Sequence, residues 1–330
     1  MTTIKEIAEK SGFSQATVSR LLNNDPKLSV SLATRNKILQ IATELGYWSR
    51  DNKLEPQPNI ALLYRVNGGE HLEDEYFALL KKELKKVCEN RQVAISTFTD
   101  IHELISEAGM YQGFIGVGTA ELTYADLLKL KQALPHGVFL DIDPAPQLFN
   151  SVKPNLVLTV QDAVDKLIEA GHQRLGFIGA ESFNLDHVAQ RDEREITFEE
   201  YTKFRHVTEA KIYSQGIVSV ANGYQLAKRA LADKGQLPDA FIVASDTLSV
   251  GVLQAFNEAG IKIPEQTAII SINNSEIARY VYPQLSTYNI DQAALSDLAL
   301  DVLLAEIKNS RRPLIHLTVN TKLIKRKSFM

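Results

Sequence analysis

The chain has 330 residues, 45% apolar and 23% charged, a composition typical of a globular protein with two or three domains. Its formal net charge is −4, but residues 1–53 hold eight Lys and Arg against five Asp and Glu, a net of +3, whereas the rest holds 28 against 35, a net of −7. Residues 1–53 thus form a basic head and the remaining residues an acidic body. Attraction for phosphate groups is therefore confined to the N-terminal head. The single cysteine, Cys88, excludes a disulfide framework and a cysteine-ligated metal site, and it fits a reducing compartment.

Residues 3–24 predict two short helices joined by a turn at Gly12. Ser14 stands at an N-cap position, where its hydroxyl can accept a hydrogen bond from a free amide of the first turn. Apolar residues recur at helical spacing on both sides of the glycine, namely Ile4, Ile7, Ala8, Val18, Leu21 and Leu22. A second helix with its long polar residues outward is typical of the helix-turn-helix plan of DNA-binding proteins.

A third helix is expected after Ser31, another N-cap candidate, and it should end at Gly46. We expect Tyr47 and Trp48 to pack on this three-helix core, so that residues 1–50 form one DNA-binding domain. Residues 51–59, DNKLEPQPN, are polar, contain two prolines and lack periodicity, which predicts a linker.

From Ile60 onward, short apolar runs alternate with longer amphipathic segments. We expect strands at 60–64, 93–98, 114–117, 138–140, 175–178, 240–244, 268–272, 314–319 and 323–324. We expect helices at 75–90, 124–134, 155–171, 197–208, 218–234, 248–259 and 292–308. This alternation predicts an α/β body, residues 60–330, with parallel sheets. Its length favours two doubly wound lobes with a ligand cleft between them, as in periplasmic binding proteins.

Enzyme chemistry is not indicated. The seven histidines lack zinc-ligand spacing, Gly113, Gly116 and Gly118 lack the spacing of a dinucleotide loop, and no Gly-x-Ser-x-Gly elbow is present. We therefore expect no metal and no cofactor. No apolar run is long enough to span a bilayer and no signal peptide opens the chain, so we expect a cytoplasmic protein without membrane association.

Three segments of the head are informative together: TIKEIAEKSGFSQATVSRLLNN, VSLATRNKIL and ELGY. With five segments of the body, they resemble the LacI/GalR family of sugar-responsive bacterial repressors, and the resemblance covers the whole length of the chain. The body segments are AGHQRLGFIG (170–179), ASDTLSVGVLQAF (244–256), IPEQTAIISIN (263–273), PQLSTYNID (283–291) and LIKRKS (323–328). NNDP after the second helix and the segment Arg194–Tyr201 are similar to repressors of galactose or β-galactoside operons.

The resemblance implies a repressor of a sugar-utilisation operon that binds pseudopalindromic double-stranded operator DNA as a homodimer. Gln15 and Ala16 would contact adenine and a thymine methyl in the major groove, and Arg20 would contact guanine. Residues expected to position the head on DNA, chiefly through phosphates, are Thr3, Ser14, Thr17, Ser19, Asn23, Ser31 and Thr34. For Thr17 and Thr34, helix capping is the alternative role.

The resemblance also implies a small sugar effector, galactose or a galactoside, whose binding releases the operator. The matching positions are Asp141, Arg194, Ser245, Asp246 and Asn273, the last where many members carry Asp. The alternatives are turn capping by Asp141 and Asp246 and an ion pair of Arg194 with Glu193 or Glu195. Tyr64, Phe77 and Phe198 would supply an apolar platform for the sugar ring or would belong to the core, and Gln292 stands where some members carry an aromatic residue.

The linker departs from the family pattern. Members usually carry a hinge helix of the type PNxxARSL, whose leucine wedges into the minor groove. Here SRDNKLEPQP lacks that core and Leu54 is its only apolar residue, so we do not expect such a wedge. The alternative function is a stand-alone periplasmic-type sugar-binding protein, which the basic head and the missing signal peptide disfavour.

Overall fold

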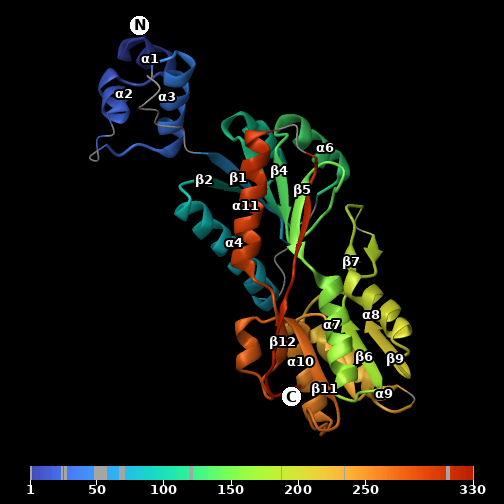
Figure 1. Cartoon of the computed structure of the whole chain (residues 1–330). Coiled ribbons are helices and arrows are strands. Elements are labelled where there is room, and N and C mark those ends of the chain that lie inside the picture. The colour runs from blue at the N-terminus through green and yellow to red at the C-terminus, as the bar shows by residue number, and fades with distance from the viewer. Residues whose placement is uncertain are drawn as a thin grey trace.

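The computed structural model describes residues 2–23, 25, 28–47, 58–66, 71–118, 122–186, 188–233, 235–309 and 313–329. It contains a small helical head and a larger body built around two sheets (Figure 1). Of the predicted linker 51–59, only Pro58 and Asn59 belong to the described residues, and Asn59 already begins the first strand. Trp48 and Leu54, on which two expectations rested, lie outside them.

The head consists of α1 (Ile4–Ser11), α2 (Gln15–Leu22) and α3 (Leu32–Glu44). Gly12 ends α1 in the left-handed conformation, φ +78°, which lets the chain turn at once into α2. The side chains of Thr3, Ser14 and Ser31 cap the three helices by accepting backbone N–H bonds. The predicted core is confirmed: its buried residues are Ile7, Ala8, Val18, Leu21, Leu22, Ile38, Leu39 and Ala42, and Tyr47 packs against them.

The body contains two six-stranded sheets. The first sheet is parallel, in the order β13-β5-β4-β3-β1-β2. Its strands are β1 (Asn59–Tyr64), β2 (Ala94–Phe98), β3 (Gly113–Val117), β4 (Gly137–Leu140), β5 (Asn150–Pro154) and β13 (His316–Val319). The second sheet has the order β14-β12-β11-β10-β6-β9 and is parallel apart from β14. Its strands are β6 (Arg174–Gly179), β9 (Glu209–Ser214), β10 (Ala240–Val243), β11 (Ala268–Asn273), β12 (Ser286–Asn289) and β14 (Lys322–Ile324).

Helices flank both sheets. Those of the first lobe are α4 (His71–Asn90), α5 (Ile101–Ser106), α6 (Tyr124–Ala133) and α11 (Gln292–Lys308), with a short 3₁₀ turn at Ala108–Met110. Those of the second are α7 (Leu156–Glu169), α8 (Glu193–Phe204), α9 (Val220–Ala232) and α10 (Asp246–Glu258), with a 3₁₀ turn at Glu276–Arg279. None of the described helices is long and apolar enough to cross a membrane.

The chain passes between the lobes three times: from β5 to α7, from β12 to α11, and from β13 to β14. The first and third of these connections are tied to each other. Asn155 Nδ2 donates to Asn320 Oδ1 at 3.1 Å, and the hydroxyls of Thr159 and Thr321 lie 2.7 Å apart. Neighbouring connections of this kind permit hinge motion of one lobe against the other.

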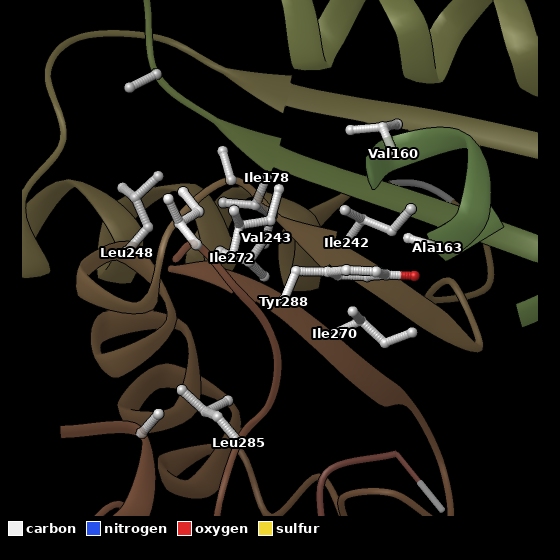
Figure 2. Close-up of a cluster of buried hydrophobic side chains, with 14 of the residues drawn as sticks. Val160, Ala163, Ile178, Ile242, Val243, Leu248, Ile270, Ile272, Leu285 and Tyr288 are labelled. Atoms are coloured by element: carbon white, nitrogen blue, oxygen red, sulfur yellow. The ribbon is translucent and has the colours of Figure 1, made fainter. Parts of the chain in front are cut away.

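The core of the second lobe shows why its strands are continuous apolar runs in the sequence. Ala240–Val243 is buried throughout, because helices cover both faces of the sheet. Figure 2 shows Tyr288 lying among Val160, Ala163, Ile242 and Ile270. Its hydroxyl donates to Asp162 Oδ2 at 2.6 Å, which satisfies the one polar group of this buried side chain.

The structure confirms the predicted two-lobed, doubly wound body, but several elements were not predicted. They are α5, β5, β9, β12 and a small antiparallel hairpin of β7 (Ser182–Phe183) and β8 (Ala189–Gln190). Strand β5 was missed because its polar residues Asn150 and Ser151 interrupt any apolar run. Both side chains are buried, and they form hydrogen bonds with Glu306 and His316 respectively. Helix α8 was predicted from 197 but begins at Glu193, because Asp192 caps it.

Candidate functional site

A cavity of about 620 Å³ lies between the two lobes. The first lobe contributes Asp141, which follows β4, and Lys153 of β5. The second contributes Ser245 after β10 and Asn273 at the end of β11. These side chains meet because the carboxyl ends of the parallel strands in both sheets face the same crevice, where open α/β sheets bind ligands.

Asp141 is held by Tyr76 of α4, whose hydroxyl donates to Asp141 Oδ1 at 2.5 Å. Burial raises the pKa of Asp141 to about 6, although the Tyr76 hydrogen bond and the charge of Arg194 act in the opposite direction. Burial and the Asp141 charge also raise the pKa of Tyr76, so its phenol stays a donor. Gln292 Nε2 donates to the carbonyl of Tyr76 at 3.0 Å and thereby fixes α11 against this part of α4.

Arg194 forms a bidentate ion pair with Asp192, through Nε at 2.7 Å and Nη2 at 2.8 Å. Its Nη1 donates to the carbonyl of Ala244 at 2.7 Å. Burial would lower the pKa of Arg194, but the charge and hydrogen bonds of Asp192, together with the charges of Glu193 and Asp141, raise it above its usual value. Burial would raise the pKa of Asp192, but the charge and hydrogen bonds of Arg194, together with the Lys153 charge, hold it below its usual range. The acidic partner is therefore Asp192, rather than Glu193 or Glu195.

The two acids flanking Arg194 have other partners. Glu193 accepts an ion pair from Lys153 Nζ at 3.1 Å, and this pair crosses the cleft from α8 to β5. Glu195 accepts from Arg191 Nε at 2.6 Å, and Arg191 Nη2 also reaches Glu199 at 2.5 Å. The cations that line the cavity are thus all paired with carboxylates of the protein.

Four of the five predicted effector residues, Asp141, Arg194, Ser245 and Asn273, line the cavity. The fifth, Asp246, does not: its carboxylate accepts bonds from Ser275 N at 2.7 Å and from Thr287 Oγ1 at 2.7 Å. Burial raises the pKa of Asp246, and these bonds partly offset the rise. The side chain that lines the cavity beside Ser245 is Thr247.

Asn273 lies in the left-handed region, φ +115°. Within the described residues its amide makes no hydrogen bond, so donors and an acceptor are both available at the cavity.

Of the three aromatic residues predicted as a platform, only Phe77 lines the cavity. It packs edge-on against Tyr76, with ring centroids 5.2 Å apart and an interplanar angle of 83°. Tyr64 instead lies under Lys81 Nζ, and Phe198 is fully buried against Phe177. Tyr76 itself was not predicted, and its only sequence signal was its place beside Phe77.

In the head, Gln15, Ala16 and Arg20 are exposed on the outer face of α2. Arg20 Nε is paired with Asp25 Oδ2 at 2.7 Å. Several predicted phosphate-contacting residues form helix caps: Ser14 Oγ accepts from Thr17 N and Ser31 Oγ accepts from Thr34 N, both at 3.1 Å. Thr3 caps α1, and Asn23 Nδ2 lies 3.5 Å from Ser19 Oγ at the end of α2. Helix N-termini that carry hydroxyls are suited to phosphate groups.

No cluster of three potential metal ligands occurs in the part of the chain that the structure describes. A helix-turn-helix head joined to a two-lobed α/β body is the architecture of a DNA-binding regulator.

Residues 3–49 match the family model described as bacterial regulatory proteins, lacI family, and residues 164–329 match a periplasmic binding protein-like domain. The chain belongs to the LacI family of transcriptional regulators.

Two relatives match over nearly the whole length. The HTH-type transcriptional regulator LacR of Lactobacillus helveticus is 51% identical, over 100% of this chain and 99% of that protein. GanR of Bacillus subtilis (strain 168) is 40% identical, over 99% of both chains. The fold also matches the crystal structure of the lac repressor dimer bound to operator and the anti-inducer ONPF, with a TM-score of 0.69 at 19% identity, over 100% of this chain and 99% of that chain.

Proposed function

We propose that the protein is a repressor of a sugar-utilisation operon and that a small neutral sugar, galactose or a galactoside, releases it from its operator. The head, residues 1–50, would read the DNA and the body, residues 60–330, would bind the effector and form the dimer. The observation that carries this proposal is the cleft cavity. Its cations Lys153, Arg191 and Arg194 are paired with carboxylates of the protein, whereas the Asp141 carboxylate and the Asn273 amide are suited to a polyhydroxyl ligand.

The ion pairs of the cavity favour a neutral ligand over an anionic one. An anion would need a cation to bind it, but Arg194 is engaged by Asp192 and Lys153 by Glu193. Breaking either pair would leave a carboxylate without its partner in a confined site, which is unfavourable. Hydroxyl groups need only donors and acceptors, which Asp141 and Asn273 supply beside the aromatic surface of Phe77.

The choice of galactose or a galactoside rests on the segments that resemble repressors of such operons, NNDP and Arg194–Tyr201. A stand-alone sugar-binding protein remains the second candidate, and the cavity alone would suit it equally. The function of a stand-alone sugar-binding protein would give no role to the exposed Gln15, Ala16 and Arg20 of α2, so we favour the repressor.

Footprinting with the intact purified protein tests the proposal. DNA upstream of the gene's own neighbours is probed without sugar and with galactose, lactose, glucose or ribose. We expect a protected pseudopalindrome that galactose or lactose releases and that ribose leaves protected. Protection that no sugar changes would contradict the effector, protection strengthened by sugar would contradict release, and absence of any protected site would favour the stand-alone binding protein.

A further inference from the structure

The β7–β8 hairpin, inserted between β6 and α8, lines the cavity from the second lobe while contacting the first. Figure 1 shows β7 on the side of the second lobe that faces the first lobe. Leu185, between the two strands, packs against an apolar cluster of the first lobe that includes Phe114, Phe139 and Phe149. Ile142 and Leu148 of the first lobe pack against the same cluster. The hairpin is therefore held at both lobes and forms one wall of the cavity; its lining residues are Ser182, Phe183, Asn184, Leu185 and Gln190.

Phe183 is an unusual wall residue because 48% of it is exposed although it lines the cavity. The same hairpin carries two side-chain amides with hydrogen-bonding groups that make no bond to any described residue. The Asn184 side-chain oxygen accepts from Asp186 N and Val188 N, at 3.0 and 2.9 Å, but its Nδ2 has no hydrogen-bond partner among the described residues. The side-chain amide of Gln190 likewise has none within the described chain.

The hairpin side chains differ chemically from Asp141 and Arg194. They offer an exposed aromatic ring and neutral amides, whereas Asp141 and Arg194 are charged groups in fixed hydrogen bonds. An aromatic face packs on the C–H face of a sugar ring, and amides both donate to and accept from hydroxyls. The hairpin therefore offers a sugar ring contacts that are different from those of Asp141 and Arg194.

The size of the cavity agrees with two rings. A hexose has the bulk of roughly six water molecules, or about 200 Å³ at about 30 Å³ per water. The cavity of about 620 Å³ therefore has room for more than one ring.

We propose that the hairpin forms a subsite for a second sugar ring, so that the preferred effector is a disaccharide or longer galactoside. This proposal rests on the proposed function, that the cavity binds a sugar. One ring lies against Asp141, Arg194 and Asn273. The second ring stacks on Phe183, and its hydroxyls bind the side-chain amides of Asn184 and Gln190.

Isothermal titration calorimetry of the full chain with galactose, lactose and melibiose tests the subsite. We expect at least one disaccharide to bind more tightly than galactose. Phe183→Ala should weaken that disaccharide roughly tenfold, which is about 1.4 kcal/mol, because the second ring loses its stacking surface. Galactose affinity should change less than about twofold, because galactose does not occupy this subsite. Phe183→Tyr, which keeps the ring, should retain the disaccharide affinity.

Phe204→Ala is the matched control. Phe204 lies at the end of α8, is 72% exposed and does not line the cavity, so its removal should change neither affinity. Equal weakening of galactose and disaccharide by Phe183→Ala would overturn the subsite, as would galactose binding as tightly as every disaccharide in the unmodified protein. Folded protein that binds none of the three sugars would instead overturn the proposed function.

Discussion

Replacement of Arg194 by Ala tests whether one residue serves both the fold and the effector site. In the pair Arg194–Asp192 the side chains are 17% and 14% exposed, so the substitution leaves a nearly buried carboxylate without its two charge-assisted bonds. It also removes the donor to the Ala244 carbonyl at 2.7 Å. Breaking a buried ion pair from one side costs about 3–5 kcal/mol, whereas removing both partners costs much less.

We therefore expect Arg194→Ala to lower the melting temperature of the body by about 10 °C, since 1 kcal/mol corresponds to roughly 2–4 °C in a domain of this size. The double variant Arg194→Ala/Asp192→Ala should recover part of this loss. Both variants should still protect the operator below their melting temperatures, because the head has its own core. Neither should be released by the effector, which footprinting with and without sugar measures.

Two results would refute this reasoning. If Arg194→Ala melts at the temperature of the unmodified protein, the ion pair does not support the fold. If the cognate sugar releases Arg194→Ala at the normal concentration, Arg194 does not belong to the effector site.

Four further predictions concern the cleft, the head and the packing of the second lobe. Because the pKa of Asp141 is raised to about 6, the ionised acceptor is lost as the pH falls through that value. Sugar affinity measured by calorimetry should therefore decline between pH 7 and pH 5, and a similar decline in Asp141→Asn would contradict this role. Arg20→Ala should lose about 1–3 kcal/mol of discrimination between operator and single-base variants in binding titrations, whereas equal loss on random DNA would indicate a phosphate contact. Asp25→Ala, which frees Arg20 from its ion pair, should strengthen binding to random DNA. Gly251→Ala should lower the free energy of unfolding, measured by urea denaturation, by about 1–3 kcal/mol, because its Cβ would lie 2.0 Å from a backbone carbonyl oxygen of α9. Gly109→Ala, with open space around it, is the control, and equal effects of the two substitutions would contradict the packing argument.

The head could be predicted because its signals are local. Caps at Ser14 and Ser31 and the left-handed turn at Gly12 each depend on a few neighbouring residues. The cleft position of Asp141, Ser245 and Asn273 was also predictable, since each residue follows a recognisable apolar strand at the carboxyl edge of a sheet.

The remaining parts of the site depend on contacts that no local pattern records. Lys153 was missed together with β5, because the buried side chains of that strand include polar ones paired with residues 156 and 165 positions away. Asp246 follows a predicted strand as Asp141 does, yet capping of α10 by Ser245 leaves its carboxylate directed at β12 instead of the cavity. The hairpin was missed because two-residue strands carry no periodicity.

The arrangement of the lobes determines which contacts of the sugar can regulate DNA binding. The chain enters the body at β1, an inner strand of the first sheet, so the head is joined to the first lobe. A sugar held by the first lobe alone would not distinguish between lobe arrangements and would leave operator affinity unchanged. Under the proposed function, the differential binding energy therefore comes from contacts with the second lobe, for which Arg194, Ser245 and Asn273 are the candidates. Coupling between two sites is reciprocal. If the sugar weakens operator binding by a given factor, as proposed, operator DNA must weaken sugar binding by the same factor.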